Sequence, residues 1–91
     1  MPYRLTQDAH AAVRRMPPEG RHRLRAALTA VAEGRQRGID MKRLEPPSRR
    51  PPLYRLRIGS WRAVYRHDGD VALVLSVFPR REGYGWLERM G

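Results

Sequence analysis

Arginines recur on three segments of this chain that alternate like β-strands. They are Arg55 and Arg57 on the first segment, Arg62 and Arg66 on the second, and Arg80 and Arg81 just after the third. If the three segments are neighbouring strands, these guanidinium groups converge on one patch. Such a cluster grips phosphate through paired N–H donors and stabilises the charge that develops when a ribose 2′-hydroxyl attacks a phosphodiester. The pattern therefore indicates a phosphate-binding site with metal-independent chemistry.

Two further features strengthen this interpretation. Tyr84 and Trp86 follow the last arginines and are placed to stack on nucleobases, and Arg49 and Arg50 lie in a stiff, proline-rich basic loop. Taken singly, an arginine on an exposed strand face is ordinary edge protection. The joint placement, with Glu82 as the one acid among these residues, favours a nucleic-acid site.

The sequence lacks the residues that other kinds of catalytic site need. The chain has no cysteine and three histidines, and no two carboxylates stand at a helical spacing. Metal hydrolysis and Ser-His-Asp chemistry are therefore unsupported, and no glycine-rich loop precedes a helix to hold a nucleotide. His67 is better explained as a residue beside a turn than as a catalytic base. We expect no metal and no small-molecule cofactor.

The net charge of +10 on 91 residues, with Lys42 as the only lysine, points to a polyanionic partner. A membrane surface is a weaker alternative, because it calls for a basic amphipathic helix with bulky apolar anchors. A third alternative is that the basic surface only keeps the protein soluble.

Residues 1–91 are expected to form one domain, since this length supports one modest core. The absence of cysteine, of a secretion signal and of an apolar span predicts a cytoplasmic protein.

Helices and strands must position the segments that carry the arginines. Apolar spacing predicts a helix over residues 6–16, with Thr6 as N-cap, and a second helix after Pro17 and Pro18 that Gly34 ends. Strands are predicted over residues 53–58, 61–66 and 71–78, with a hairpin at Asp68-Gly69 and one short strand within residues 38–45. Residues 71–78 are apolar on both faces, which places that strand in the middle of the sheet. The expected fold is α+β, a helical hairpin packed on a three- to four-stranded antiparallel sheet.

The whole pattern resembles the RelE/ParE superfamily of toxins from bacterial type II toxin–antitoxin modules, on the RelE-like side. The most specific stretches are Tyr-Arg-Leu-Arg-Ile-Gly-Ser-Trp-Arg-Ala-Val-Tyr at residues 54–65 and Arg-Arg-Glu-Gly-Tyr at residues 80–84. The likeness covers nearly the whole chain.

This resemblance implies a ribosome-dependent endoribonuclease that enters the ribosomal A site, against 16S rRNA, and cleaves mRNA by 2′-hydroxyl attack. It also implies a cognate antitoxin, an acidic protein that covers the basic surface. Carried over by position, Arg55 and Arg57 take the basic strand positions, Arg62 stabilises the phosphate, Arg81 lies near the leaving 5′-oxygen and Tyr84 stacks on a base. Trp86 is the alternative stacking residue, and Arg49, Arg50, Arg66 and Arg80 are expected to bind RNA.

One departure from the family bears on activity. Efficient relatives often carry lysine where this chain has Arg55 and Arg57, and lysine is more readily tuned to act as a base. Two alternatives to mRNA cleavage therefore stand: a ParE-like inhibitor of DNA gyrase on the same fold, and a weakly active relic that binds RNA or its antitoxin.

Overall fold

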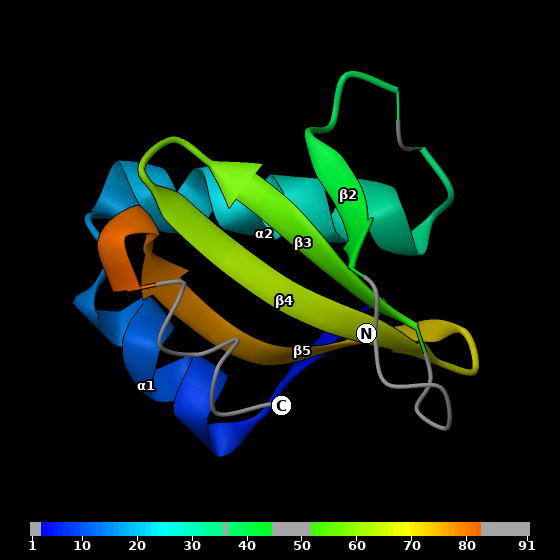
Figure 1. Cartoon of the computed structure of the whole chain (residues 1–91), viewed down its shortest axis with the longest axis horizontal. Helices are drawn as coiled ribbons and strands as arrows, with labels where there is room; N and C mark the ends of the chain where they lie inside the picture. The colour runs from blue at the N-terminus through cyan, green and yellow to red at the C-terminus, as the bar shows by residue number, and fades with distance from the viewer. Residues whose placement is uncertain (1–2, 36, 45–51, 83–91) are drawn as a thin grey trace.

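Two helices pack on one face of a five-stranded mixed sheet in the computed structural model, which describes residues 3–35, 37–44 and 52–82 (Figure 1). The elements in chain order are β1 (Tyr3–Leu5), α1 (Gln7–Arg15), α2 (Pro18–Ala32), β2 (Met41–Leu44), β3 (Leu53–Ile58), β4 (Trp61–Asp68), β5 (Val71–Pro79) and the short 3-10 helix η1 (Arg80–Glu82). The strand order across the sheet is β1-β5-β4-β3-β2. β1 runs parallel to β5, and the other neighbours are antiparallel.

The predicted helical hairpin is confirmed. The Thr6 hydroxyl accepts a hydrogen bond from the Ala9 amide at 3.2 Å and donates one to the Leu75 carbonyl at 3.0 Å, so it caps α1 and ties it to β5. Pro17 and Pro18 stop α1 and start α2, where proline at the first helical position loses no hydrogen bond. Gly34 follows the end of α2 at a φ of +77°.

The main core lies between the helices and the sheet. Ala9, Val13, Leu24 and Leu28 from the helices meet strand residues such as Tyr65, and all five are almost fully buried. The Tyr65 ring stacks on Tyr54 at 5.4 Å between centroids, and its hydroxyl donates to the Met41 sulfur at 2.6 Å. This core holds the three long strands β3, β4 and β5 in register and thereby fixes the direction of every side chain on the opposite face.

The sheet corrects the sequence prediction in two respects. It has five strands rather than three or four, because residues 3–5 pair in parallel with β5, Tyr3 opposite Ala72. A three-residue strand carries too short an alternation to be read from sequence, and its partner lies far away along the chain. The strand β5 is interior as predicted, but β4 occupies the central position. Within the described residues, no helix is both long and apolar enough to cross a membrane.

Replacing Thr6 by alanine removes the α1 cap and the bond to β5, so we expect the free energy of unfolding to fall by about 1–2 kcal/mol. Urea unfolding monitored by circular dichroism measures this change. Thr6→Ser retains the hydroxyl and serves as the matched control. A loss from Thr6→Ser as large as that from Thr6→Ala would contradict the assigned role.

Burial, followed by the proximity of Tyr54, raises the pKa of Tyr65 well above its ordinary value. The neutral phenol is therefore favoured in the folded state, and the stability that this provides is present below the ordinary pKa of about 10 and lost as the pH rises above it. We expect wild-type stability to fall more between pH 9 and pH 11 than that of Tyr65→Phe. Equal losses in urea melts of the two proteins would refute this account.

Candidate functional site

The face of the sheet turned away from the helices carries the strand arginines. Strand alternation puts Arg55, Arg57, Arg62 and Arg66 on this side, and Lys42 lies opposite Arg55 on the neighbouring strand β2. We call these five residues the basic face. The sequence prediction that the strand arginines share one surface is therefore consistent with the register of β3 and β4.

Arg62 is the most constrained member of the basic face. The residue as a whole is only 9% exposed. Its Nη1 donates hydrogen bonds to the carbonyl oxygens of Gly59 at 3.0 Å and Trp61 at 2.9 Å. Those two bonds use both hydrogens of Nη1, so Nε–H and the two hydrogens of Nη2 are left for a ligand. The backbone of the β3–β4 turn thus holds this guanidinium in place.

Positive charges surround Arg62. Burial lowers its pKa, the charges of Arg57, Arg55 and Arg80 lower it further in that order, and Asp40 opposes the shift. Arg57 lies directly opposite Arg62 in the β3–β4 ladder, a position in which like charges are destabilising. Because the ordinary pKa of an arginine lies far above neutral pH, Arg62 keeps its charge at neutral pH and presents a concentrated positive potential.

A single ion pair offsets this repulsion among the described residues of the basic face. The Arg57 Nη1 lies 3.7 Å from an Asp40 carboxylate oxygen, and both side chains are about half exposed, at 49% and 58%. The Arg57 amide also donates to the Asp40 carbonyl at 3.0 Å, which holds the two residues side by side. At this length and exposure the pair contributes little stability and can be displaced by a stronger anion.

Arg55 and Arg66 carry unused donors. The Nε atom of each is buried and has no hydrogen-bond partner within the described chain. A buried guanidinium N–H without an acceptor is unfavourable, so these two groups gain from an anion that reaches them. The basic face is thus held together by the fold rather than by internal charge pairing.

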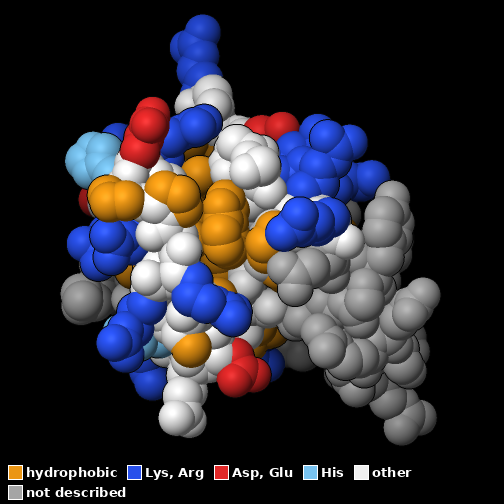
Figure 2. Space-filling view, turned by 90° about the vertical axis from the view of Figure 1, so that its left-hand side faces the viewer, with side chains coloured by type: hydrophobic (Ala, Val, Ile, Leu, Met, Phe, Trp, Pro, Cys, Tyr) orange, Lys and Arg blue, Asp and Glu red, His pale blue; other side chains and the backbone are white. Residues whose placement is uncertain are grey.

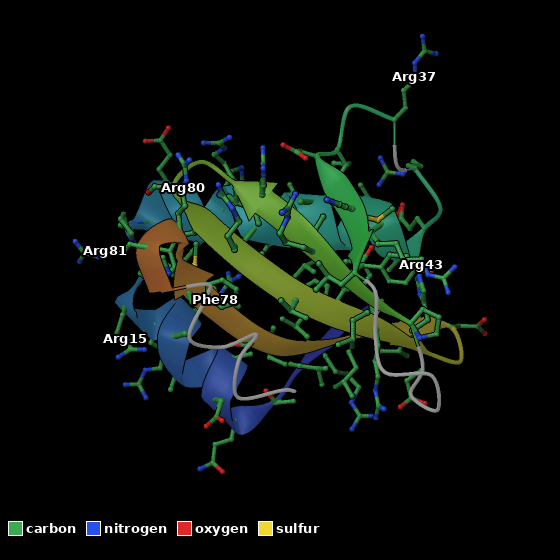
Figure 3. The ribbon with its side chains drawn as sticks, in the orientation of Figure 1. Arg15, Arg37, Arg43, Phe78, Arg80 and Arg81 are labelled. Atoms are coloured by element: carbon green, nitrogen blue, oxygen red, sulfur yellow. The ribbon has the colours of Figure 1, made fainter. Side chains whose placement is uncertain are left out.

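A small apolar cluster adjoins the arginines, which the sequence analysis did not anticipate. Leu53, Val64 and Phe78 are buried together on this side of the sheet, with Leu44 and Leu75 packed against them. Figure 3 shows Phe78 near the end of β5, just before η1. The alternation of apolar residues along the strands could have predicted this cluster, because its residues alternate with those that face the helices.

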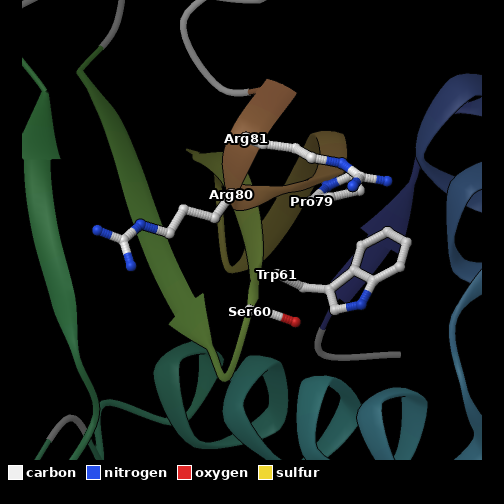
Figure 4. Close-up of a pocket in the computed structure, with 5 residues that line it drawn as sticks. All are labelled: Ser60, Trp61, Pro79, Arg80 and Arg81. Atoms are coloured by element: carbon white, nitrogen blue, oxygen red, sulfur yellow. The ribbon is translucent and has the colours of Figure 1, made fainter.

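The two arginines of η1 point in opposite directions (Figures 3 and 4). Arg80 extends toward β3 and contributes to the potential at Arg62, whereas Arg81 extends to the other side of η1, above Trp61. Both, with Ser60, Trp61 and Pro79, line a surface cavity of about 600 Å³. Figure 2 views this end of the molecule, where hydrophobic side chains lie in the middle and Lys and Arg side chains surround them.

The structure thus brings together some of the predicted site residues and separates others. Arg55, Arg57, Arg62 and Arg66 share the basic face, Arg80 approaches it, and Arg81 points away from it. Arg49, Arg50, Tyr84 and Trp86 lie outside the described residues. Sequence reasoning missed Asp40 and Lys42, whose relevance appears only when β2 is paired with β3.

His67 belongs to an aromatic group on the helix side of the sheet. Its ring meets Tyr54 at 5.5 Å and Tyr65 at 5.7 Å, both edge to face. Its place next to the last residue of β4 agrees with the prediction of a residue beside a turn. Residues 3–35, 37–44 and 52–82 contain no group of three His, Cys, Asp or Glu side chains placed to hold a metal ion.

Comparison with known proteins gives the family. The model of the ParE toxin of the type II toxin–antitoxin system parDE matches residues 3–84. The chain belongs to the ParE toxin family. The predicted resemblance to the RelE/ParE superfamily is thereby confirmed, and the protein is a toxin of a toxin–antitoxin system.

Solved structures support the same fold. The chain is similar to a chain of the RelB-RelE antitoxin-toxin complex from Methanococcus jannaschii, with a TM-score of 0.73, 17% identity, and 90% of this chain and 95% of that chain covered. It is also similar to a chain of the archaeal RelE-RelB complex from Pyrococcus horikoshii OT3, with a TM-score of 0.66, 25% identity, and 88% and 97% covered. The sequence comparison with curated proteins finds no match.

Because like charges converge on Arg62, removing one of them should stabilise the toxin. We expect Arg80→Gln to raise the free energy of unfolding by about 0.5 kcal/mol at 50 mM NaCl, and this gain to shrink at 500 mM NaCl as the repulsion is screened. Urea melts at the two salt concentrations measure it. Arg14→Gln is the matched control, because Arg14 lies in the last turn of α1, where a positive charge is favourable. A gain from Arg14→Gln equal to that from Arg80→Gln would count against local repulsion.

Proposed function

We propose that this toxin is an mRNA endoribonuclease whose basic face binds the scissile phosphate in the ribosomal A site. The observation that carries the proposal is the placement of Arg62, a buried guanidinium fixed by two backbone carbonyls and surrounded by Arg55, Arg57 and Arg80. A preorganised positive group in a site of restricted exposure stabilises developing negative charge at little reorganisation cost.

The proposed reaction is an internal transfer of the phosphoryl group. The ribose 2′-oxygen bonds to phosphorus while the bond from phosphorus to the 5′-oxygen breaks, which leaves a 2′,3′-cyclic phosphate and a 5′-hydroxyl. The free donors of Arg62 bind the non-bridging oxygens, whose charge grows in the transition state. The 2′-hydroxyl proton passes to water and the leaving oxygen takes a proton from water, since arginines that stay protonated do not serve as the base.

The residues around Arg62 have supporting roles in this proposal. Arg55 and Arg57 hold the adjoining phosphates from β3, and Arg66 extends the basic face along β4. The resemblance assigns Arg81 to the leaving oxygen, whereas the side-chain directions favour Arg80, which points toward β3. Tyr84, or Trp86 in its place, is the base-stacking residue in this proposal.

An acidic antitoxin is the expected protein partner. The two solved structures compared above are of complexes with an antitoxin, named RelB. The net charge of +10 and the uncompensated guanidinium groups favour an acidic segment that covers the basic face. Such a partner would occupy the groups that bind RNA and so would block cleavage.

Inhibition of DNA gyrase is the second candidate function. The matching family model is that of the ParE toxin, which favours it specifically. A supercoiling assay with purified gyrase distinguishes the two functions: loss of supercoiling without RNA cleavage supports gyrase inhibition, and cleavage without loss of supercoiling supports the ribonuclease.

Primer extension on a defined mRNA in a bacterial translation extract tests the ribonuclease directly. We expect new 5′ ends that require ribosomes, and a loss of about a hundredfold or more in cleavage rate with Arg62→Ala. Arg15→Ala, at the end of α1 in the helix layer on the other side of the sheet from the basic face, is the control and should cleave like the wild type. Undiminished cleavage by Arg62→Ala would overturn the assignment of this site.

The same assay assigns the η1 arginines. Arg80→Ala and Arg81→Ala each remove one charge from the same short helix, so their comparison holds the net charge constant. A larger loss from Arg80→Ala would favour the direction seen in Figure 4, and a larger loss from Arg81→Ala would favour the role implied by the family resemblance.

A further inference from the structure

A groove of about 600 Å³ lies where α2, the segment before β2 and the β3–β4 turn meet. Arg23 and Ala26 line it from α2, Asp40 from the segment before β2, and Arg57, Gly59 and Arg62 from β3, β4 and their turn. Arg57 and Arg62 also belong to the basic face. The groove therefore continues that face around the edge of the sheet, toward the helix layer.

The charges of the groove are unbalanced. Three of its lining side chains are guanidinium groups, and among the described lining residues Asp40 is the one carboxylate. That carboxylate is 3.7 Å from Arg57 and more than half exposed, so it neutralises little of the total. The chain thus leaves an excess of positive charge in a cavity that is large enough to take a phosphate and its sugar.

Arg23 and Arg62 approach the same residue from different elements. The Arg23 Nη1 lies 3.2 Å from the position that a Cβ of Gly59 would occupy, and the Arg62 Nη1 donates to the Gly59 carbonyl at 3.0 Å. Gly59 has a φ of +59°, a conformation that residues with a side chain rarely adopt. Glycine therefore allows the turn to form, and its missing Cβ leaves room for the close approach of Arg23. An arginine of α2 therefore lies beside the turn that fixes Arg62, next to the proposed phosphate site.

We propose that this groove is a second phosphate-binding site for RNA, in which Arg23 grips the phosphodiester next to the one held by Arg62. The inference rests on the proposed function, because it extends the path of the same RNA strand. Arg57 lies on both surfaces and bridges the two phosphates. Asp40 acts as a resident counter-anion that the phosphate displaces from Arg57.

The lining favours a nucleic-acid strand over an acidic peptide. Protein partners derive most of their affinity from a few anchor side chains, above all aromatic ones and arginine, in well-packed and fully desolvated pockets. Alanine and glycine instead make up much of this lining, with Ile39 and Ile58 as its two large apolar residues. Arginines, which typically contact phosphates, are most of its charged groups. An open groove of this kind, lined by small residues and arginines, favours a sugar-phosphate backbone over the anchored side chains of a protein partner.

Binding of a fluorescent 2′-O-methyl RNA hexamer, which cannot be cleaved by 2′-hydroxyl attack, tests the proposal in anisotropy titrations at 150 mM NaCl. We expect Arg23→Gln to weaken binding about tenfold, as the loss of one charge-assisted contact implies. Arg25→Gln removes the same charge from the same helix, at an exposed position outside the groove lining. It should weaken binding less than about twofold, because Arg25 does not line the groove and its charge acts on the strand only through screening solvent.

A second pair of variants tests the counter-anion. Asp40→Asn should tighten binding more than Asp70→Asn, which removes the same charge from the exposed β4–β5 turn. Thermal melts of all variants confirm that they are folded, and Arg23→Lys should recover part of the affinity if charge in the groove is what binds.

The outcomes separate the two proposals. Equal effects of Arg23→Gln and Arg25→Gln, with the wild type binding well, would overturn the second phosphate site and leave the proposed function standing. If Arg23→Gln weakens binding of the antitoxin but not of RNA, the groove is a protein-docking site and the proposal is wrong. Failure of the folded wild type to bind RNA at all would overturn the proposed function, and this inference with it.

Discussion

Electrostatic repulsion among the arginines of the basic face is the constraint that the rest of the structure has to satisfy. Burial lowers the pKa of Arg62 most, the charges of Arg57, Arg55 and Arg80 lower it further, and Asp40, which forms a long ion pair with Arg57, opposes the shift. Side chains with this much mutual repulsion would splay apart on a loop. The rigid sheet prevents this, because cross-strand pairing sets the spacing of Arg57 and Arg62 and the core behind it fixes the strands.

Backbone carbonyl groups, rather than acidic side chains, supply the hydrogen-bond acceptors that hold the arginines. Two carbonyl oxygens at the β3–β4 turn accept from Arg62, and the Ser60 carbonyl accepts from the Arg80 amide at 2.8 Å, which joins η1 to the same turn. Carbonyl dipoles hold a guanidinium without cancelling its charge. The positive potential is thus retained for a ligand, at the expense of stability, which is the usual relation between a preorganised site and its fold.

Local patterns carried most of the fold prediction. The spacing of apolar residues and the pair Pro17-Pro18 define the hairpin within a few residues of chain, and alternation is enough to place Arg55 and Arg57 on one side of β3. The sequence analysis did not predict the strand β1, because its pairing partner lies far away along the chain. The burial of Arg62, the nearness of Asp40 and the direction of Arg81 depend on tertiary packing and on the rotation that η1 imposes after β5, none of which alternation encodes.

The parallel pairing of β1 with β5 also governs when the toxin takes shape during synthesis. Tyr3 lies opposite Ala72, and β5 separates β1 from every other strand, so the first segment of the sheet has no neighbour until the ribosome has made the last one. Thr6 likewise caps α1 while bonding to Leu75. The strand β4 also lacks one of its two neighbours until β5 has been made. The N-terminal strand and the cap of α1 therefore reach their final contacts only after synthesis of β5, so the order of synthesis delays closure of the sheet.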